Sequence, residues 1–352
     1  MRGKQKKREA ETVGPLDESA LRKIAGDAFR ATGMRPDMAD DAAEMLVLAE
    51  MMGIRTHGLN RIENYVERLR NGGVNPDADP VISAPAPALR HVDGQNGLGA
   101  AVAIRATRAA MEAAREAGLG AAFCRASSHL GALTPQLLHA AEAGFAAIFT
   151  TNTSPMIAPQ GGRSAVIGNT PVGIALPDTT GQPVILDMAL SVAARSKVRR
   201  SADKGEPIPA NWATDEHGVP TTDAAAALKG MMQAIGGHKG ANLALCLDLL
   251  AGGLSGAAIL SEIPNANINP GAVANVGHLF VIIDVTKLIS PDELSNRLDV
   301  ARHLIRDSAP PDSKPQPRLP GARALEALAK ARAEGLSVEP KLLSRLQTLA
   351  AA

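Results

Sequence analysis

Aromatic side chains are almost missing from this chain, which has one Trp, one Tyr and five Phe in 352 residues. Proteins that bind single-stranded nucleic acid stack the bases on aromatic rings. Base stacking is therefore excluded as a main function. The core has to be built from Ala, Leu, Ile, Val and Met, which is feasible because hydrophobic residues make up 45% of the chain.

Cysteine is equally scarce. Cys124 and Cys246 are too few and too far apart for a disulfide framework or a C-x-x-C metal knuckle. Each lies in an apolar stretch, so we expect both thiols to be buried in packing roles. The chain also lacks an H-E-x-x-H pair and a G-x-S-x-G elbow, so zinc-protease and serine-hydrolase functions lose their usual anchors, and we predict no metal site.

A strong net charge and a long apolar run are missing too. The chain has 37 basic and 36 acidic residues, so no net field attracts nucleic acid or an anionic membrane. The basic run at residues 2–8 is not followed by an apolar segment, unlike a signal peptide. The most apolar stretch, 240–260, is interrupted by Asn242 and Asp248. We expect a cytoplasmic protein with neither nucleic acid nor a membrane as partner.

The length of the chain predicts two domains, because 352 residues exceed what one core usually supports. Helical periodicity begins at Asp17, at Pro36 and at Leu59, and it returns after Pro291. Residues 1–15 are predicted to be a disordered basic tail. We expect a mainly helical domain formed by residues 16–78 and 286–352, and a cofactor-binding α/β domain over residues 79–285.

The central part alternates between strand and helix. Residues 76–95 resemble a linker with one short strand. Helices are predicted from Gly97 to Ala117, over 132–143 and after Gly240, and strands over 121–124, 146–150 and 279–285. Residues 172–176 and 184–186 flank a turn-rich segment that is typical of a hairpin. The fold class is therefore mixed α/β, with a largely antiparallel sheet inserted between helical ends.

The sequence does not match the usual nucleotide-binding motifs. Gly97-Leu98-Gly99 begins like a dinucleotide fingerprint, but Val102 stands where Gly or Ala is needed for close helix packing. Residues 236–240 have neither the spacing nor the trailing Ser or Thr of a Walker A loop. A nucleotide would have to bind in a non-Rossmann site.

The run Arg55-Thr56-His57-Gly58-Leu59-Asn60-Arg61, followed by Tyr65, holds the most informative chemistry. If a helix starts near Gly58, His57 and Arg61 share one face, so an imidazole that exchanges protons lies beside a guanidinium that fits a carboxylate. This pair suggests a site for a 2-hydroxy or 2-keto acid. The alternative is a plain helix start, with Thr56 as N-cap and both side chains solvated.

Three other segments carry polar groups in apolar or tightly turned surroundings. Residues 127–131, Ser-Ser-His-Leu-Gly, precede a predicted helix whose free N–H groups could bind an anion, or Ser128 could simply cap that helix. Asp187 ends a strand, either as a turn former or as an acceptor for a ribose hydroxyl. Lys239 stands at the start of a long helix, either near a phosphate or merely solvated.

Read in order, these motifs resemble those of the type-2 malate/L-lactate dehydrogenase family, nicotinamide enzymes unrelated to the Rossmann dehydrogenases. The resemblance runs from about Leu16 to Arg323. It comprises T-H-G-L-N-R at 56–61, S-S-H-L-G-A at 127–132, T-N-T-S-P-M-I-A-P-Q-G-G-R at 151–163, G-N-T-P at 168–171, V-I-L-D-M-A-L-S at 184–191, A-R-S-K at 194–197, N-W-A-T-D-E-H-G-V-P-T-T-D at 211–223, G-G-H-K-G at 236–240, L-S-G-A at 254–257, G-H-L-F at 277–280 and R-L-P-G at 318–321.

The resemblance implies a role for each motif. His57 would be the proton donor and acceptor, supported by Thr56, although in some relatives the histidine that matches His129 is called the base. The substrate carboxylate would be bound by Arg61, with Thr170, Arg195 and Ser196 nearby. The nicotinamide cofactor, NAD or NADP, would be held by His129, Leu130, Gly131, Ala132, Leu133, Thr153, Asp187, Met188, Ala189, Lys239, Arg318, Leu319, Pro320, Gly321 and Arg323. The family's usual homodimer is the expected assembly.

Some positions depart from the family pattern. Thr56 stands where most relatives have Ser, and Ala322 replaces a usual Glu. Aromatic rings of relatives are replaced at a set of positions that could widen the pocket, namely Pro135, Gln136, Gln160, Ala241 and Asn242. Lys197 favours 2-hydroxy acids, because reductases of cyclic imines can carry Asp there.

We therefore predict an oxidoreductase that moves a hydride between NAD(P) and a small 2-hydroxy or 2-keto acid of the malate, lactate, sulfolactate or ureidoglycolate class. An NADPH-dependent reductase of cyclic imino acids, such as 1-piperideine-2-carboxylate, is the main alternative. A nucleotide-binding regulator without activity is the other. The sequence leaves open the preferred cofactor, the substrate's stereochemistry, and whether His57 or His129 is the principal acid/base.

Overall fold

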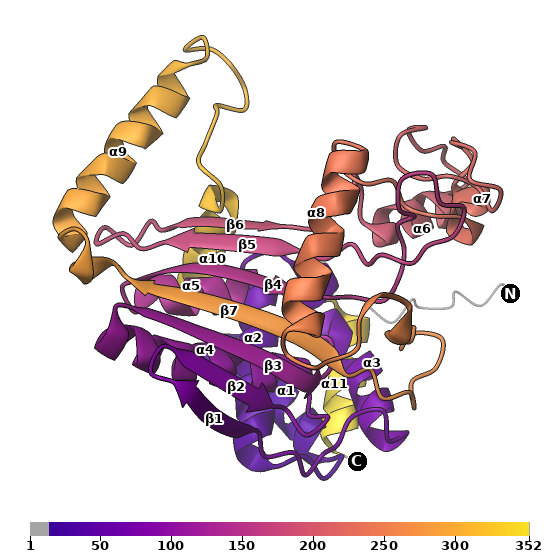
Figure 1. Cartoon of the computed structure of the whole chain (residues 1–352), viewed down its shortest axis with the longest axis horizontal. Helices are drawn as coiled ribbons and strands as arrows, with labels where there is room; N and C mark the ends of the chain where they lie inside the picture. The colour runs from indigo at the N-terminus through magenta and orange to yellow at the C-terminus, as the bar shows by residue number, and fades with distance from the viewer. Residues whose placement is uncertain (1–13, 352) are drawn as a thin grey trace, which may run out of the picture.

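The computed structural model describes residues 14–351, so the predicted basic tail lies outside it except for its last two residues. A seven-stranded sheet forms the centre, with helices packed against one of its faces (Figure 1). The strands are β1 (Val81–Ala86), β2 (Leu89–Asp93), β3 (Leu119–Ser127), β4 (Phe145–Thr151), β5 (Val172–Leu176), β6 (Val184–Met188) and β7 (Val276–Asp284).

The sheet is largely antiparallel, as predicted. Its strand order is β1-β2-β3-β7-β4-β5-β6, and within this sheet β2 and β3 form the parallel pair. The predicted hairpin of β5 and β6 is confirmed by antiparallel pairing from Val172 with Met188 to Leu176 with Val184. The predicted linker at 76–95 instead holds two paired strands, β1 and β2. β2 pairs with β3, a partner distant in sequence, and β1 in turn pairs with β2, which the local sequence did not reveal.

Helix α4 (Gly99–Ala117) packs on the covered face of the sheet, because its small side chains permit a close approach. At Gly120 of β3, a Cβ atom would lie 2.0 Å from the backbone oxygen of Ala110, so only glycine fits there. Beside α4 on the same face lies α5 (Thr134–Glu142), and α2 (Pro36–Met51) packs against both helices as a further layer.

The remaining helices surround this core. Helix α1 (Glu18–Arg30) packs between α2 and the C-terminal helix α11 (Pro340–Ala350), and α3 (Ile62–Arg70) and α10 (Ala322–Glu334) complete this group. One continuous hydrophobic core includes residues of these helices and of the sheet. The predicted division into a helical and an α/β domain stays a prediction.

A second, smaller core lies in a lobe that the sequence patterns did not predict in detail. It contains α6 (Arg195–Lys204), α7 (Ala224–Lys229) and the first half of α8 (His238–Asp248), which begins two residues before the expected Gly240. Cys246 on α8 is exposed, so its predicted burial is wrong, whereas Cys124 is buried as expected. The apolar residues next to Cys246 in the sequence do not bury its thiol, because several of them are exposed too.

Helix α9 (Pro291–Asp307) stands clear of the sheet at one end of the molecule (Figure 1). It is attached to the β5–β6 turn through an ion pair of Arg302 with Asp178 and a hydrogen bond of 2.9 Å from the backbone N–H of Thr179 to the hydroxyl of Ser295. Within residues 14–351, no helix is long and apolar enough to span a bilayer.

Candidate active site

The His57 segment forms two successive 3₁₀ turns, Arg55–His57 and Leu59–Arg61, before α3 begins at Ile62. The helical run predicted after Gly58 does form, but its first turn is 3₁₀ and His57 belongs to a separate turn before it. Gly58 lies between the turns with φ −99° and ψ −136°, which is not helical. Arg61 instead reaches back along the turn, where its Nε donates to the carbonyl oxygen of Thr56 at 2.8 Å. The guanidinium thus stays beside His57 by a contact that the helical spacing did not predict.

Glu50 of α2 anchors these turns through its side chain. Its carboxylate is buried and accepts a hydrogen bond of 2.9 Å from the backbone N–H of Leu59. A Cβ atom at position 58 would lie 2.4 Å from the same carboxylate, so Gly58 is required for the contact. Burial raises the pKa of Glu50, while the Leu59 hydrogen bond and Arg55 oppose the rise. The sequence signal for this anchor was an acidic residue inside the apolar run 45–51.

The ring of His57 is oriented by its neighbour. The Thr56 hydroxyl lies 3.0 Å from Nδ1 of His57, which leaves Nε2 available to a ligand. Thr56 makes no cap hydrogen bond to the backbone, so the alternative of a plain N-cap is wrong. A hydroxyl on one ring nitrogen fixes the orientation that the other nitrogen presents.

His129 lies face to face with His57. The two ring centroids are 5.7 Å apart and the planes differ by 29°. The phenol oxygen of Tyr65 lies 2.6 Å from Nδ1 of His129, which again leaves Nε2 free. The two imidazoles are therefore held in the same way, each by a hydroxyl on Nδ1. We call His57, His129, Arg61 and Tyr65 the histidine pair site.

Both imidazoles are kept neutral at pH 7. Burial, followed by the charge of Arg61, lowers the pKa of His57 to about 4. Burial also lowers the pKa of His129 well below its usual value, and the charges of Arg61 and His57 act in the same direction. Burial raises the pKa of Tyr65 to about 12. A neutral histidine accepts a proton, and the adjacent guanidinium favours a bound anion.

The other predicted substrate residues come from the sheet and the lobe. Thr170 is fully buried, and its hydroxyl lacks a hydrogen-bond partner among the described residues. Arg195 begins α6 and donates to the carbonyl of Leu228, while Ser196 next to it is exposed. Across residues 14–351, no hydrogen bond connects these three side chains to the histidine pair, so their substrate role stays a prediction.

Asp187 has a structural partner that the sequence did not reveal. One of its oxygens accepts from both the backbone N–H of Thr134 at 3.0 Å and its hydroxyl at 2.8 Å. The Thr134 N–H at the start of α5 is therefore already bonded to Asp187 and is not available to an anion, while the cofactor role of residues 129–133 stays a prediction. The Ser128 hydroxyl contacts α4 instead, where it accepts from the backbone N–H of Gly99 at 2.9 Å. The alternative of Ser128 capping the following helix is wrong.

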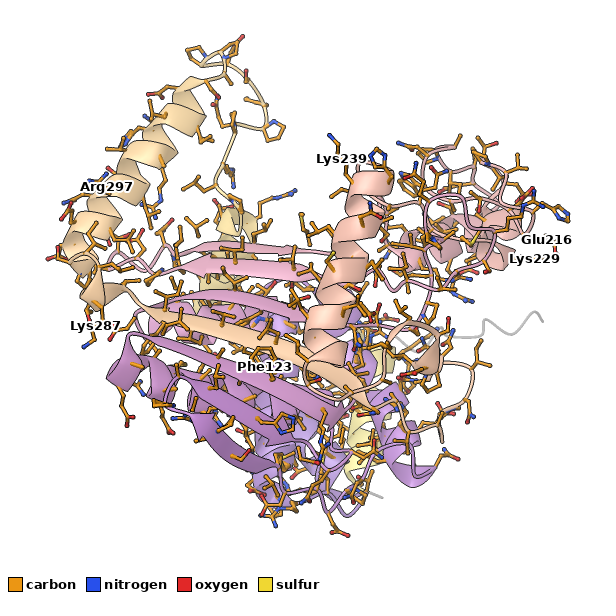
Figure 2. The ribbon with its side chains drawn as sticks, viewed as in Figure 1. Phe123, Glu216, Lys229, Lys239, Lys287 and Arg297 are labelled. Atoms are coloured by element: carbon orange, nitrogen blue, oxygen red, sulfur yellow. The ribbon has the colours of Figure 1, made fainter. Side chains whose placement is uncertain are left out.

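The rest of the predicted cofactor residues lie in several separate segments. The 318–321 segment runs beside β6, where Pro320 accepts from the backbone N–H of Ile185 at 3.1 Å, and Arg318 pairs with Glu326 at 2.7 Å. Thr153 follows β4, and its hydroxyl donates to Asn169 at 3.1 Å. Lys239 stands at the free end of α8, away from the sheet (Figure 2). Leu130, Gly131, Ala132 and Leu133 link β3 to α5, Met188 and Ala189 follow Asp187, and Leu319 and Arg323 flank the 320–321 turn.

The start of α8 suits the phosphate groups of a dinucleotide. The N-cap residue of α8 is Gly237, which gives no side-chain cap, so the first N–H groups of the helix can face an anion, with Lys239 adding a positive charge. For a metal ion, the part of the chain that the structure describes offers no group of three or more His, Cys, Asp or Glu side chains.

Comparison with known proteins agrees with this geometry. The sequence profile of the malate/L-lactate dehydrogenase family matches residues 16–347. L-sulfolactate dehydrogenase from Methanothermobacter thermautotrophicus is 33% identical over 328 residues, 93% of this chain and 94% of that protein. Delta(1)-pyrroline-2-carboxylate reductase from Ancylobacter novellus is 33% identical over 326 residues, with coverage of 93% and 94%. The solved sulfolactate dehydrogenase from Methanocaldococcus jannaschii superposes with a TM-score of 0.86 at 28% identity, covering 96% of both chains.

The fold and the histidine pair site thus define a nicotinamide-dependent oxidoreductase of the non-Rossmann type. The chain belongs to the malate/L-lactate dehydrogenase family. It is an NAD(P)-dependent dehydrogenase that acts on CH–OH donors.

Proposed function

We propose that the protein interconverts a 2-hydroxy acid and its 2-keto acid in the histidine pair site, with Arg61 binding the substrate carboxylate. The observation that carries this proposal is the arrangement of two neutral imidazoles with free Nε2 atoms beside one guanidinium. A 2-hydroxy acid presents a carboxylate and a hydroxyl on adjacent carbons. The guanidinium and one imidazole offer a matching binder and proton acceptor.

The bound nicotinamide supplies or accepts the hydride. In the oxidation direction, neutral His57 takes the hydroxyl proton at Nε2 while Thr56 holds Nδ1. In the reduction direction, protonated His57 returns the proton to the former carbonyl oxygen. Arg61 fixes the acid so that the reacting oxygen stays near the ring. His129, oriented by Tyr65, is the alternative proton acceptor, and its stacking on His57 supports a role in the same site.

The cyclic imino acid reductase is the second candidate. The Ancylobacter novellus relative is named for such a reaction and is as similar in identity as the sulfolactate dehydrogenase. Lys197 on α6 is exposed and opposes this reading, because the family resemblance associates Asp at this position with imine reduction.

A substrate panel decides between the candidates. We expect oxidation of NADH or NADPH with pyruvate, oxaloacetate, sulfopyruvate or another 2-keto acid, and much slower turnover with 1-piperideine-2-carboxylate. Faster turnover of the imine would reject the keto-acid proposal. Binding of both reduced cofactors without turnover on any acid or imine would instead support the regulator that the sequence left open.

The pH dependence of keto-acid reduction follows from the His57 pKa of about 4. Reduction requires the imidazolium, so kcat/KM falls about tenfold per pH unit above that pKa. Oxidation requires the neutral ring, so its kcat/KM stays level above the pKa and is lost below it. Initial rates in both directions from about pH 5 to about pH 8 check the sign. A reduction rate that stays level past pH 7 would contradict a depressed pKa in the free enzyme.

We also propose a homodimer in the cytoplasm. The face of the sheet opposite α4 exposes an apolar row, with Ile148 45% exposed and its cross-strand partner Ile174 38% exposed. Phe123 lies on this open face (Figure 2). Helix α8 crosses the face (Figure 1) and adds exposed Leu243, and the π-helical turn Leu249–Gly253 that follows it adds exposed Leu250. Exposed apolar side chains gathered on one face are typical of an interface between subunits.

The predicted interface is tested by a charge on that row. Ile148→Arg is expected to convert the dimer to a monomer in size-exclusion chromatography with light scattering. Val219→Arg, at a residue 57% exposed in the α6–α7 lobe, is the control and should leave the dimer intact. A wild-type protein that is monomeric at micromolar concentration would reject the dimer.

A further inference from the structure

His278 is a buried imidazole that the proposed mechanism does not use. It lies on β7 and has no exposed surface. Both of its ring nitrogens are bonded to hydroxyl groups: Nε2 lies 2.8 Å from Oγ of Ser127, and Nδ1 lies 2.7 Å from Oγ1 of Thr151. A histidine that merely fills a core does not need two polar partners from different strands.

The two hydroxyls come from the strands on either side of β7. Ser127 is the last residue of β3, and Thr151 is the last residue of β4. Both strands run antiparallel to β7, so their carboxyl ends lie at the same end of the sheet. The His278 ring therefore bridges the ends of two strands that do not pair with each other directly.

Each bridged strand leads straight into a predicted part of the active site. Ser127 is followed by Ser128 and His129, and the His129 ring stacks on His57. Thr151 is followed by Asn152 and Thr153, the latter a predicted cofactor residue. Asn152 is itself fixed, because its side chain donates to Ala258 at 2.7 Å and accepts from the backbone N–H of Gly277 at 2.9 Å.

The backbone is distorted at the Ser127 side of the bridge. The register of β3 with β7 shifts between Cys124 and Ser127. Ala126 within this bulge has φ +46°, a conformation that side chains with a Cβ rarely adopt, and its N–H is held by Asn275 at 2.7 Å. Bulges of this type redirect a side chain next to functional sites. Here the bulge directly precedes Ser127, whose hydroxyl contacts the His278 ring.

The bridge depends on a neutral ring. Burial lowers the pKa of His278 to about 3, so at pH 7 the ring has one N–H donor and one acceptor nitrogen. One hydroxyl therefore accepts from the ring while the other donates to it. A side chain with both a donor and an acceptor is needed to hold both strand ends.

We propose that His278 is a positioning residue that fixes the distance between the segment 128–133, which carries His129, and the segment 152–153, which carries Thr153. The functional meaning of this distance rests on the proposed function, because it would set the imidazole against the bound nicotinamide. The bridge itself is a property of this chain and can be tested without substrate or cofactor.

The experiment compares His278→Leu, which removes both hydrogen bonds, with His278→Gln, which keeps a donor and an acceptor. Phe280→Leu is the matched control, because Phe280 is fully buried two residues further along β7 and packs edge-on against Phe149 at 4.9 Å between centroids. Hydrogen exchange followed by mass spectrometry is measured on peptides that cover 127–133 and 151–155. NADH and NADPH dissociation constants are measured by nicotinamide fluorescence.

We expect His278→Leu to speed exchange in both segments and to weaken reduced-cofactor binding. A misplacement of about 1 Å costs about 10²-fold in rate, so kcat/KM on a verified keto acid should fall by a similar factor. His278→Gln should recover most of each property. Phe280→Leu should lower the midpoint of thermal unfolding and leave both segments and the cofactor constants unchanged.

Single removals separate the two ends of the bridge and serve where His278→Leu does not fold. Ser127→Ala should loosen only 128–133, and Thr151→Val only 152–155. Unchanged exchange in both segments, or equal effects of His278→Leu and Phe280→Leu, would overturn the positioning role. A wild-type protein without turnover on any acid would reject the proposed function, while the exchange data would still decide the bridge.

Discussion

His57→Ala lowers kcat for keto-acid reduction by about 10²- to 10⁴-fold, the usual contribution of a general acid. The reason is that Nε2 is the ring nitrogen of His57 that is left for the substrate, whereas Nδ1 is held by Thr56. Steady-state kinetics on the substrate found in the panel give the size of the loss. Fluorescence titration with NADH is expected to show an unchanged dissociation constant, because the loss lies in proton transfer.

Two comparisons make this result specific. Asn60→Ala is the control for damage to the turn, since the Asn60 amide donates to the Arg55 carbonyl at 3.1 Å and is exposed. It should keep near-normal kcat. His129→Ala tests the other imidazole. A larger loss of kcat for His129→Ala than for His57→Ala would transfer the acid/base role to His129, with Tyr65 as its orienting hydroxyl.

The second large effect is expected at Arg61. Arg61→Ala removes the proposed partner of the substrate carboxylate, and losing one partner of a charge-assisted contact costs about 2–5 kcal/mol. We expect kcat/KM to fall by roughly 10²-fold or more, mainly through a higher KM for the acid. Arg61→Lys keeps the charge without the planar fork and should recover only part of the loss.

Arg55→Ala provides the matched control for Arg61. Arg55 belongs to the same pair of 3₁₀ turns, its side chain is 72% exposed, and its Nε lies 4.0 Å from Glu50. Its removal deletes one positive charge from the segment without touching the proposed carboxylate binder. Equal increases in KM for Arg55→Ala and Arg61→Ala would show that general charge, and not the Arg61 contact, binds the acid.

The sequence predicted the elements that rest on local signals. The Ala-rich helix α4 and the β5–β6 hairpin formed as expected, since helix periodicity and turn residues are properties of neighbouring positions. The mixed, largely antiparallel sheet and the family were predicted as well.

The sequence could not predict contacts between distant residues. The 55–61 turns depend on Glu50 in another helix, so the expectation that His57 and Arg61 share one helical face failed. Tyr65 and His129 meet across 64 positions. His278 shows no sequence signal beyond the motif that contains it, because a histidine in an apolar strand usually predicts ordinary packing. The prediction that Cys246 is buried failed for the same reason, because the sequence does not show which apolar side chains of α8 pack against the rest of the chain.

The place of β7 in the sheet has a consequence for how the chain folds during synthesis. β7 begins at Val276, yet it lies between β3 and β4, which end at Ser127 and Thr151. Until residues 276–284 have left the ribosome, both of these strands keep an open edge with unpaired backbone groups. Pairing over such a distance along the chain closes slowly. Unpaired strand edges are prone to pair with other chains, so the insertion of this one late strand removes an aggregation-prone surface of the nascent protein.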